Sequence, residues 1–344
     1  MKSIYVLAEI GVNHDGSVDL ALEMVRTAAL AGANGVKFQT YNASLLASEN
    51  SPSYWDLSKE PTKSQIELFK RHECPDISFY IPLIEECNVQ GIDFNTTCFD
   101  EFSLSKFAEF LPFIKISSSD ITNFPLIELA TSFNKPLVLS CGASSLEEIK
   151  AVVRFVRVKT NVRITLLHCV LNYPCRPESA NLACITTLMN TFKDEDNIEF
   201  GYSCHVSMPY SIEAGLISKV LGSTFLEKHY TTSRLKIGND HYHSWTAEDL
   251  LLFRNREREV SQLLGDSTPD LESQALARLN ARRSLYLARD VYEGKLIEKD
   301  DLISLRPYAK VCPTEYKKLI GQRWASSVNA GEAVDYNMIR KVNV

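Results

Sequence analysis

The chain has 344 residues, 45% of them hydrophobic and 23% charged, a balance typical of a globular protein with one barrel-sized domain and a smaller second one. A formal net charge of −6 argues against nucleic acid as the main partner, and no apolar run approaches the roughly 20 residues of a membrane-spanning helix. The first residues lack a secretory cleavage pattern, and nine cysteines without a C-x-x-C pair suit reduced thiols, so we expect a cytoplasmic protein.

Strand-length apolar runs recur along the chain, with helix-length segments between them. Most of these runs are almost continuously apolar, which is typical of parallel strands covered by helices. The eight predicted strands span residues 4–11, 35–41, 92–98, 113–118, 136–142, 162–169, 199–205 and 224–230. Eight such units predict an α/β protein built as a (β/α)8 TIM barrel, whose active site lies at the C-terminal ends of the strands.

Other segments divide the chain further. Residues 42–63, rich in Ser, Asn and Pro, predict a long loop of the kind that is usually functional or mobile. A last helix over 246–264 ends a predicted barrel domain of residues 1–265, which a linker of residues 266–281 follows. Residues 282–344 predict a small second domain with short strands, among them 284–288 and 325–328.

Polar and charged residues stand at the ends of the predicted strands, where a barrel brings them to one mouth. In chain order they are Glu9, Lys37, Gln39, Thr97, Lys115, Ser117, Ser118, Ser119, Asp120, Ser140, His168, Ser203, His205, Glu227 and His229. Two lysines among hydroxyls suit a phosphorylated, carboxylated ligand, because each ligand oxygen gains a charge-assisted hydrogen bond. The alternative is that Lys37 and Lys115 pair with Glu9, Glu227 or Asp120.

Two histidines, His205 and His229, end neighbouring predicted strands. Neutral imidazoles that converge on one point predict a site for a divalent metal, which polarises a second substrate as a Lewis acid. Unrelated strand-end histidines are the alternative. His241 and His243 alternate in a way that could place both on one strand face, whereas His14 suits a structural hydrogen bond as well as a site.

Several of these residues lie in segments that resemble the sialic acid synthase family. The segments are AEIGVNHDG (8–16), VKFQT (36–40), IKISSSDITN (114–123), LLHC (166–169), LEKH (226–229), GNDH (238–241), RSLY (283–286) and LRP (305–307). They follow the family's order over nearly the whole chain, and their combination is far more specific than any one segment.

The resemblance implies a TIM barrel followed by an antifreeze-like (SAF) domain at 282–344. It implies condensation of phosphoenolpyruvate with an N-acylated amino sugar, N-acetylmannosamine or a related 2,4-diamino-sugar, to give a sialic acid-type nonulosonic acid and phosphate. It further implies a divalent cation, Mn²⁺ or Mg²⁺, held by His205 and His229. The same family forms a domain-swapped homodimer in which an arginine matching Arg306 enters the neighbouring barrel.

On the positions that match the family's motifs, the resemblance assigns roles to individual residues. Those expected around phosphoenolpyruvate are Lys37, Thr97, Lys115, Ser118, Ser140 and Ser203. Gln39, Tyr173, Asp240 and Arg306 are expected to face the sugar, beside the 241–243 segment, which disfavours a second metal site there. Glu9, Asp120 and Lys115 are the expected catalytic groups, with the carboxylates handling protons or orienting the aldehyde and water.

Some positions depart from the family's commoner pattern, among them Leu171, Cys204 and the turn after Arg306. Leu171 removes one possible hydrogen bond near the phosphate, which is worth about 0.5–1.5 kcal/mol and is too little to abolish binding by two lysines. Two alternatives stay open: a barrel aldolase or metal hydrolase acting on a phosphorylated substrate, and a non-catalytic, ligand-binding relative.

Overall fold

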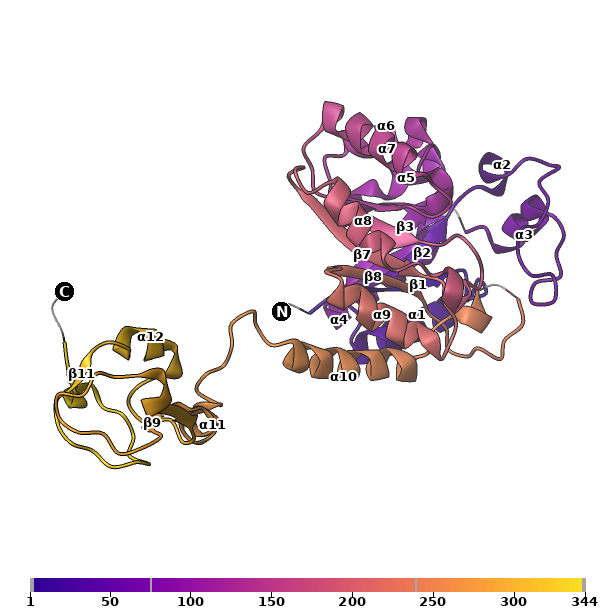
Figure 1. Cartoon of the computed structure of the whole chain (residues 1–344). Helices are drawn as coiled ribbons and strands as arrows, with labels where there is room; N and C mark the ends of the chain where they lie inside the picture. The colour runs from indigo at the N-terminus through magenta and orange to yellow at the C-terminus, as the bar shows by residue number, and fades with distance from the viewer. Residues whose placement is uncertain (1–2, 75, 239, 342–344) are drawn as a thin grey trace. The chain divides into compact units, whose positions relative to one another are not determined.

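The computed structural model describes residues 3–74, 76–238 and 240–341 (Figure 1). The chain divides into two compact units, Met1–Gly265 and Asp266–Val344. Asn239, part of the 238–241 segment, lies outside the described residues. No helix in the described ranges is long and apolar enough to cross a membrane.

Eight parallel strands form the barrel of the first unit. They are β1 (Tyr5–Gly11), β2 (Gly35–Thr40), β3 (Asp93–Cys98), β4 (Ile114–Ile116), β5 (Leu137–Ser140), β6 (Ile164–Cys169), β7 (Ile198–Cys204) and β8 (Phe225–His229). Their order is β3-β2-β1-β8-β7-β6-β5-β4, and the Asn95 side-chain amide of β3 donates to the Phe113 carbonyl beside β4, which joins the two ends. The predicted TIM barrel is therefore confirmed.

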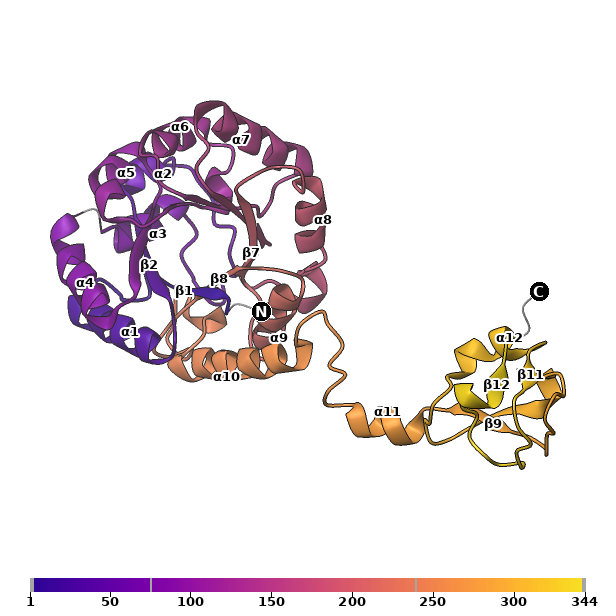
Figure 2. The ribbon, with the colours of Figure 1, turned by 90° about the vertical axis from the view of Figure 1, so that its left-hand side faces the viewer.

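Helices form a ring around these strands, as the view along the barrel shows (Figure 2). The helices of this unit are α1 (Val18–Leu30), α2 (Ala43–Leu46), α3 (Gln65–His72), α4 (Ile77–Gln90), α5 (Glu101–Phe107), α6 (Phe124–Ser132), α7 (Leu146–Lys159), α8 (Cys184–Thr191), α9 (Tyr210–Val220) and α10 (Ala247–Leu264). Of these, α2 and α3 lie outside the ring, on the long segment between β2 and α4 (Figures 1 and 2). Polar caps satisfy the first free backbone N–H groups of several of the helices: Ser145, for example, forms a reciprocal capping box with Glu148 at the start of α7.

Alternation along the strands sorts their inward-facing side chains into layers. One apolar cluster inside the barrel consists of Leu7, Phe113, Val138, Leu167 and Phe225, each on a different strand or directly before it. Two residues farther along the same strands stand Glu9, Lys115, Ser140, Cys169 and Glu227, all of which line a cavity. The apolar layer therefore closes the bottom of the barrel, and the next layer supplies polar chemistry above it.

The second unit has its own small core. Leu285, Leu287, Val291, Ile297, Val311, Leu319, Trp324 and Val334 are its buried hydrophobic residues. Its elements are α11 (Ala275–Ala281), which lies within the predicted linker, the antiparallel pair β9 (Ser284–Leu287) and β10 (Leu302–Leu305), α12 (Tyr316–Leu319), and the antiparallel pair β11 (Arg323–Trp324) and β12 (Ile339–Arg340).

One predicted strand of this unit is wrong. Residues 325–328 do not form a strand, and only an isolated bridge pairs Val328 with Val291. The strand lies earlier, at β11, because it is Trp324 that is fully buried in the small core. Burial of that ring sets the pairing with β12 more strongly than the local preference of the Ser-Ser segment.

Candidate active site

A cavity of about 440 Å³ opens among the carboxyl ends of the barrel strands, a size that suits a small-molecule ligand. All the first-unit residues to which the resemblance assigns a role line it: Glu9, Lys37, Gln39, Thr97, Lys115, Ser118, Asp120, Ser140, Tyr173, Ser203, His205, His229 and Asp240. Arg306 belongs to the second unit, where it directly follows β10. Glu227 also lines the cavity, at the strand end where the sequence places it.

Lysines and carboxylates alternate across the base of the cavity. Lys37 Nζ lies 2.6 Å from Glu9 Oε2 and 3.9 Å from Glu227 Oε1, and Lys115 Nζ lies 3.8 Å from Glu227 Oε2. Burial raises the pKa of Glu9, whereas for Glu227 the effect of burial is overcome by Lys115 and Lys37, which hold its pKa below the ordinary value. The lysines thus have carboxylate partners, as the alternative interpretation proposed, yet they keep contact with the cavity.

Hydroxyl groups complete the surroundings of both ammonium groups. Lys37 Nζ donates to Thr97 Oγ1 at 2.8 Å, and Lys115 Nζ donates to Ser140 Oγ at 2.8 Å. Ser203 Oγ donates to Glu227 Oε1 at 3.3 Å. Two cations with adjacent hydroxyls form a donor-rich surface of the kind that binds phosphate and carboxylate oxygens.

The turn after β4 adds further polar groups to the same wall. Asp120 Oδ2 accepts hydrogen bonds from Ser117 Oγ at 2.6 Å and Ser119 Oγ at 3.2 Å. Ser118 Oγ accepts from the Gly142 backbone N–H at 3.0 Å. A Cβ atom at Gly142 would lie 2.7 Å from that hydroxyl oxygen, so the approach of the two loops requires glycine here.

Gly11 allows the backbone bulge that places the Glu9 carboxylate at the cavity. The pairing of β1 with β2 shifts register between Glu9 and Gly11, and Gly11 has a φ of +56°, which favours glycine. Gln39 Nε2 donates to Glu9 Oε1 at 3.0 Å beside this bulge. The local kink therefore brings Glu9 and Gln39 together at the cavity wall.

His205 and His229 meet at the cavity with their ring centroids 5.4 Å apart. His205 Nδ1 lies 2.8 Å from the Val170 carbonyl oxygen, and because a carbonyl only accepts, Nδ1 carries the proton and Nε2 keeps its lone pair. Burial lowers the pKa of His205 to about 4 and that of His229 well below its ordinary value, so both rings are neutral near pH 7. Neutral, buried imidazoles with a free lone pair fit a divalent cation.

A polar and aromatic wall comes from the segment between β2 and α4. Its members that line the cavity are Tyr41, Leu46, Tyr54, Trp55, Glu60, Gln65, Leu68, Phe69 and His72. Trp55 Nε1 donates to the carbonyls of Glu60 at 3.1 Å and Thr62 at 3.0 Å, which ties the segment to itself. The sequence predicts a functional loop here but not these residues; the Tyr54-Trp55 pair within a polar loop is the signal that could have identified them.

The other histidines of the barrel differ in their surroundings. His14 Nδ1 accepts from the Gly16 N–H, and His168 Nε2 donates to the Ala180 carbonyl; neither residue lines the cavity. Residues His241–His243 form a short 3-10 helix and not a strand, so their alternation does not put the two rings on one strand face. His241 Nδ1 lies 2.7 Å from Thr231 Oγ1, whereas the His243 ring lies 4.8 Å from that of His229.

Residues 24–269 match the NeuB family, and residues 282–340 match the SAF domain. The chain belongs to the NeuB family. The resemblance to sialic acid synthases is confirmed, and the protein is an enzyme of this type.

Named relatives of this NeuB family chain make different products. It is 32% identical over 335 residues to the N,N'-diacetyllegionaminic acid synthase of Legionella pneumophila, covering 95% of this chain and 92% of that one. It is 31% identical over 309 residues to the N-acetylneuraminate-9-phosphate synthase of Drosophila melanogaster, covering 86% and 78%. The solved N-acetylneuraminic acid synthetase of Leptospira borgpetersenii, in complex with citrate, is 32% identical, with a TM-score of 0.70 and coverage of 80% and 90%.

Proposed function

We propose that this enzyme condenses phosphoenolpyruvate with an N-acylated amino sugar, giving a sialic acid-type nonulosonic acid and phosphate. The observation that carries the proposal is the pair of buried lysines, Lys37 and Lys115, each with a hydroxyl partner, at the base of a cavity that also holds two neutral imidazoles. The named relatives that synthesise legionaminic, pseudaminic and sialic acids support the same chemistry. An aldolase or hydrolase acting on a phosphorylated substrate would bring a phosphate to these lysines, but it would turn over without phosphoenolpyruvate.

In the proposed reaction, carbon 3 of phosphoenolpyruvate forms a bond to the aldehyde carbon of the open-chain sugar. A water oxygen adds to carbon 2, the bond from carbon 2 to the phosphate oxygen breaks, and a ketone and inorganic phosphate result. Lys37 and Lys115 would hold the phosphate and carboxylate, so that charge moving between oxygens stays next to fixed donors. Glu9, held between Lys37 and Gln39, would handle protons or orient the aldehyde and water.

The site also suits a divalent cation. His205 and His229 would hold Mn²⁺ or Mg²⁺, as their burial, neutrality and closeness support. When bound, such a cation supplies Lewis-acid polarisation of the sugar aldehyde. Tyr173, whose ring centroid lies 4.2 Å from that of His205, and Gln39 would orient the sugar beside it.

The composition of the cavity favours an uncharged sugar over a sugar phosphate. Among the described residues of the first unit that line it, the lysines are Lys37 and Lys115 and there is no arginine, so a second phosphate would depend on Arg306 of the second unit alone. Tyr54, Trp55 and Glu60 instead supply an aromatic and acidic wall, which suits acetamido and hydroxyl groups better than a second phosphate. N-acetylmannosamine and 2,4-diacetamido sugars are therefore the proposed substrates.

Phosphate release from the full-length enzyme tests the proposal. The protein is incubated with Mn²⁺, phosphoenolpyruvate and each of N-acetylmannosamine, its 6-phosphate and 2,4-diacetamido-trideoxy hexoses, with sugar-free mixtures as controls. We expect phosphate release only when a sugar is present, and mass spectrometry should detect a keto acid with a nine-carbon backbone. The 6-phosphate should give little turnover. No release with any sugar contradicts the proposed function.

A further inference from the structure

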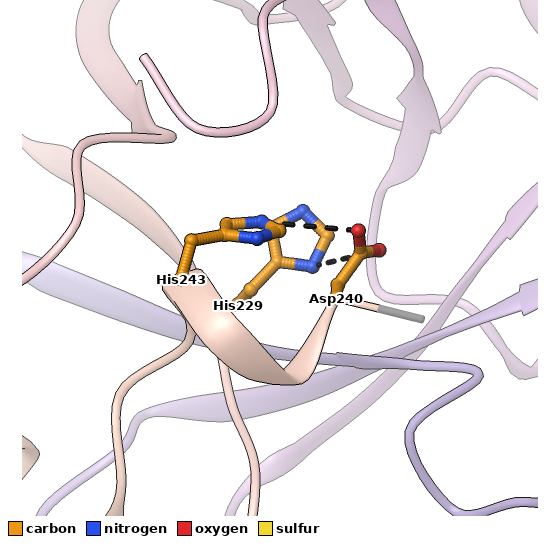
Figure 3. Close-up of side chains that lie close together, drawn as sticks. All are labelled: His229, Asp240 and His243. Carbon is orange, nitrogen blue, oxygen red and sulfur yellow. Dashed lines mark ion pairs between the residues drawn. The ribbon is translucent and has the colours of Figure 1, made fainter. Parts of the chain in front are cut away.

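A third imidazole adjoins the two that the proposed metal site uses. His243 is fully buried, and its ring centroid lies 4.8 Å from that of His229 and 6.2 Å from that of His205. Asp240 reaches both neighbours, with Oδ2 3.3 Å from His229 Nδ1 and Oδ1 3.8 Å from His243 Nε2 (Figure 3). One ligand atom from each of His229, Asp240 and His243 lies within 4.8 Å of the others.

Packing alone does not explain a histidine at position 243. Its ring lies 5.4 Å from that of Tyr173 and 4.8 Å from that of Tyr242, contacts that a phenylalanine would also make. Both ring nitrogens of His243 and Nδ1 of His229 are buried without a hydrogen-bond partner. Buried polar atoms are nearly always paired, so unpaired nitrogens on two neighbouring rings beside one carboxylate indicate a ligand that the three residues share.

A divalent cation would pair one nitrogen of each ring together with the carboxylate. Metal–nitrogen and metal–oxygen bonds of about 2.1 Å place ligand atoms roughly 3 Å apart, whereas the atoms of this cluster lie within 4.8 Å of one another, so the side chains would move closer together to coordinate an ion. His229 and Asp240 line the cavity, whereas His243 does not, so an ion between them would meet protein on one side and the cavity on the other. That arrangement leaves a coordination position for a substrate oxygen.

We propose that Asp240 and His243 join His205 and His229 as ligands of the cation, so that three imidazoles and a carboxylate hold it. This inference rests on the proposed function, since it extends the same metal site. Imidazole nitrogen favours later transition metals, whereas Mg²⁺ and Mn²⁺ prefer oxygen ligands. With three imidazoles and a carboxylate the site would still accept the Mn²⁺ of the proposed function, but it would bind Co²⁺, Fe²⁺ or Zn²⁺ more tightly than Mn²⁺ or Mg²⁺. Asp240 would then serve the metal in addition to facing the sugar.

Metal binding without substrates tests this inference. The metal-stripped full-length protein is titrated with Co²⁺, followed by visible absorption, and with Zn²⁺ and Mg²⁺ in competition with a chromophoric chelator. His243→Phe keeps a ring in place but removes both nitrogens, and His168→Phe is the control, since His168 is also buried but lies outside the cluster. We expect His243→Phe to weaken Co²⁺ binding by about 10–100-fold or more and to change its spectrum, while His168→Phe binds as the wild type does.

The outcomes separate this inference from the proposed function. Equal Co²⁺ affinity and an unchanged spectrum in folded His243→Phe overturn the role of His243 while leaving the His205–His229 site intact. A wild-type protein that binds none of the three metals overturns both. Should His243→Phe not fold by circular dichroism, X-ray absorption of the Co²⁺-loaded wild type decides: three imidazoles support the proposal and two overturn it.

Discussion

Buried lysines in this barrel satisfy their charges in two different ways. Lys115 lies among Glu227, Ser140 and the cavity, where a bound anion can reach its ammonium group. Lys228, although it neighbours Glu227 in sequence, points away from the cavity lining and donates to the carbonyls of Cys204 at 3.2 Å and Val206 at 2.6 Å. The same residue type is therefore placed for ligand binding in one case and for backbone support in the other.

Replacing these two lysines separates the roles. Lys115→Met should raise the KM for phosphoenolpyruvate by about 10–100-fold, because it removes a charge-assisted hydrogen bond worth about 1.5–3 kcal/mol. Lys228→Met should leave that KM near the wild-type value and lower the midpoint of thermal unfolding. Steady-state kinetics and thermal denaturation of both variants test this, and a normal KM in Lys115→Met would remove the lysine from the binding site.

His14 makes folding stability depend on pH. Its ring packs 4.8 Å from that of Phe79, and burial lowers its pKa from the ordinary 6.5 to about 4. As pH falls below 6.5, His14 is protonated in the unfolded chain but stays neutral in the folded chain. The contribution of His14 to the free energy of unfolding is therefore fully present above pH 6.5 and decreases as pH falls towards 4.

We expect this single group to reduce the free energy of unfolding by about 2.5 kcal/mol between pH 7.5 and 4.5. Urea unfolding of the wild type and of His14→Gln at both pH values isolates it, because the other titrating groups are common to the two chains. An identical pH dependence in the two proteins would show that His14 is not held neutral.

At the scale of elements, the segment between β2 and α4 forms part of the cavity wall in addition to joining these two elements. Trp55 fixes its shape through two indole hydrogen bonds, and Arg71 of α3 lies 3.5 Å from Glu60 Oε1. The segment thus reaches the cavity as an ordered wall rather than as a loose loop. A residue that orders a binding loop affects how often the loop opens and how tightly the loop holds its ligand.

Trp55→Phe keeps an aromatic ring but loses both hydrogen bonds. Because each is worth about 0.5–1.5 kcal/mol, we expect roughly tenfold faster proteolytic cleavage within residues 42–64. The KM for the amino sugar should rise while that for phosphoenolpyruvate changes little. Leu57→Ala, in the same segment but outside the cavity lining, is the control, and equal cleavage of the two variants would argue against this role for the indole.

At the scale of the whole molecule, the barrel and the C-terminal unit each have a separate core. Arg306 lies in the second unit, after a strand pair whose fold is supported by Asp301, which Arg289 and Lys295 contact. An arginine in a separately folded unit can complete a site in its own barrel or in that of a second subunit. We expect the second arrangement, since family resemblance implies a swapped homodimer.

Subunit mixing distinguishes these arrangements. Arg306→Ala should raise the KM for the sugar more than that for phosphoenolpyruvate, and co-expression with Lys115→Met should restore activity at about a quarter of all sites, by statistical mixing in a symmetric dimer. The control is Lys37→Met co-expressed with Lys115→Met, where both defects lie in the barrel and no rescue is expected. Absence of rescue in the first pair would place Arg306 in the site of its own chain.

The sequence by itself determined the barrel and most of the cavity lining. Apolar strand runs fix the eight parallel strands, and a period of two residues puts Glu9 above Leu7 and Glu227 above Phe225. These features depend only on the spacing of residues within each strand, so they can be predicted from the sequence.

Only the tertiary structure decided which groups meet across the barrel. The pairing of Lys37 with Glu9 and the approach of Asp240 and His243 to His229 join residues from different loops and strands, and the segment that holds Trp55 reaches the cavity only through the fold. Their distances depend on strand register, on a bulge at Gly11 and on a 3-10 helix where alternation suggested a strand. These are set by the burial and hydrogen bonding of the whole fold, because local preference is too weak to fix them.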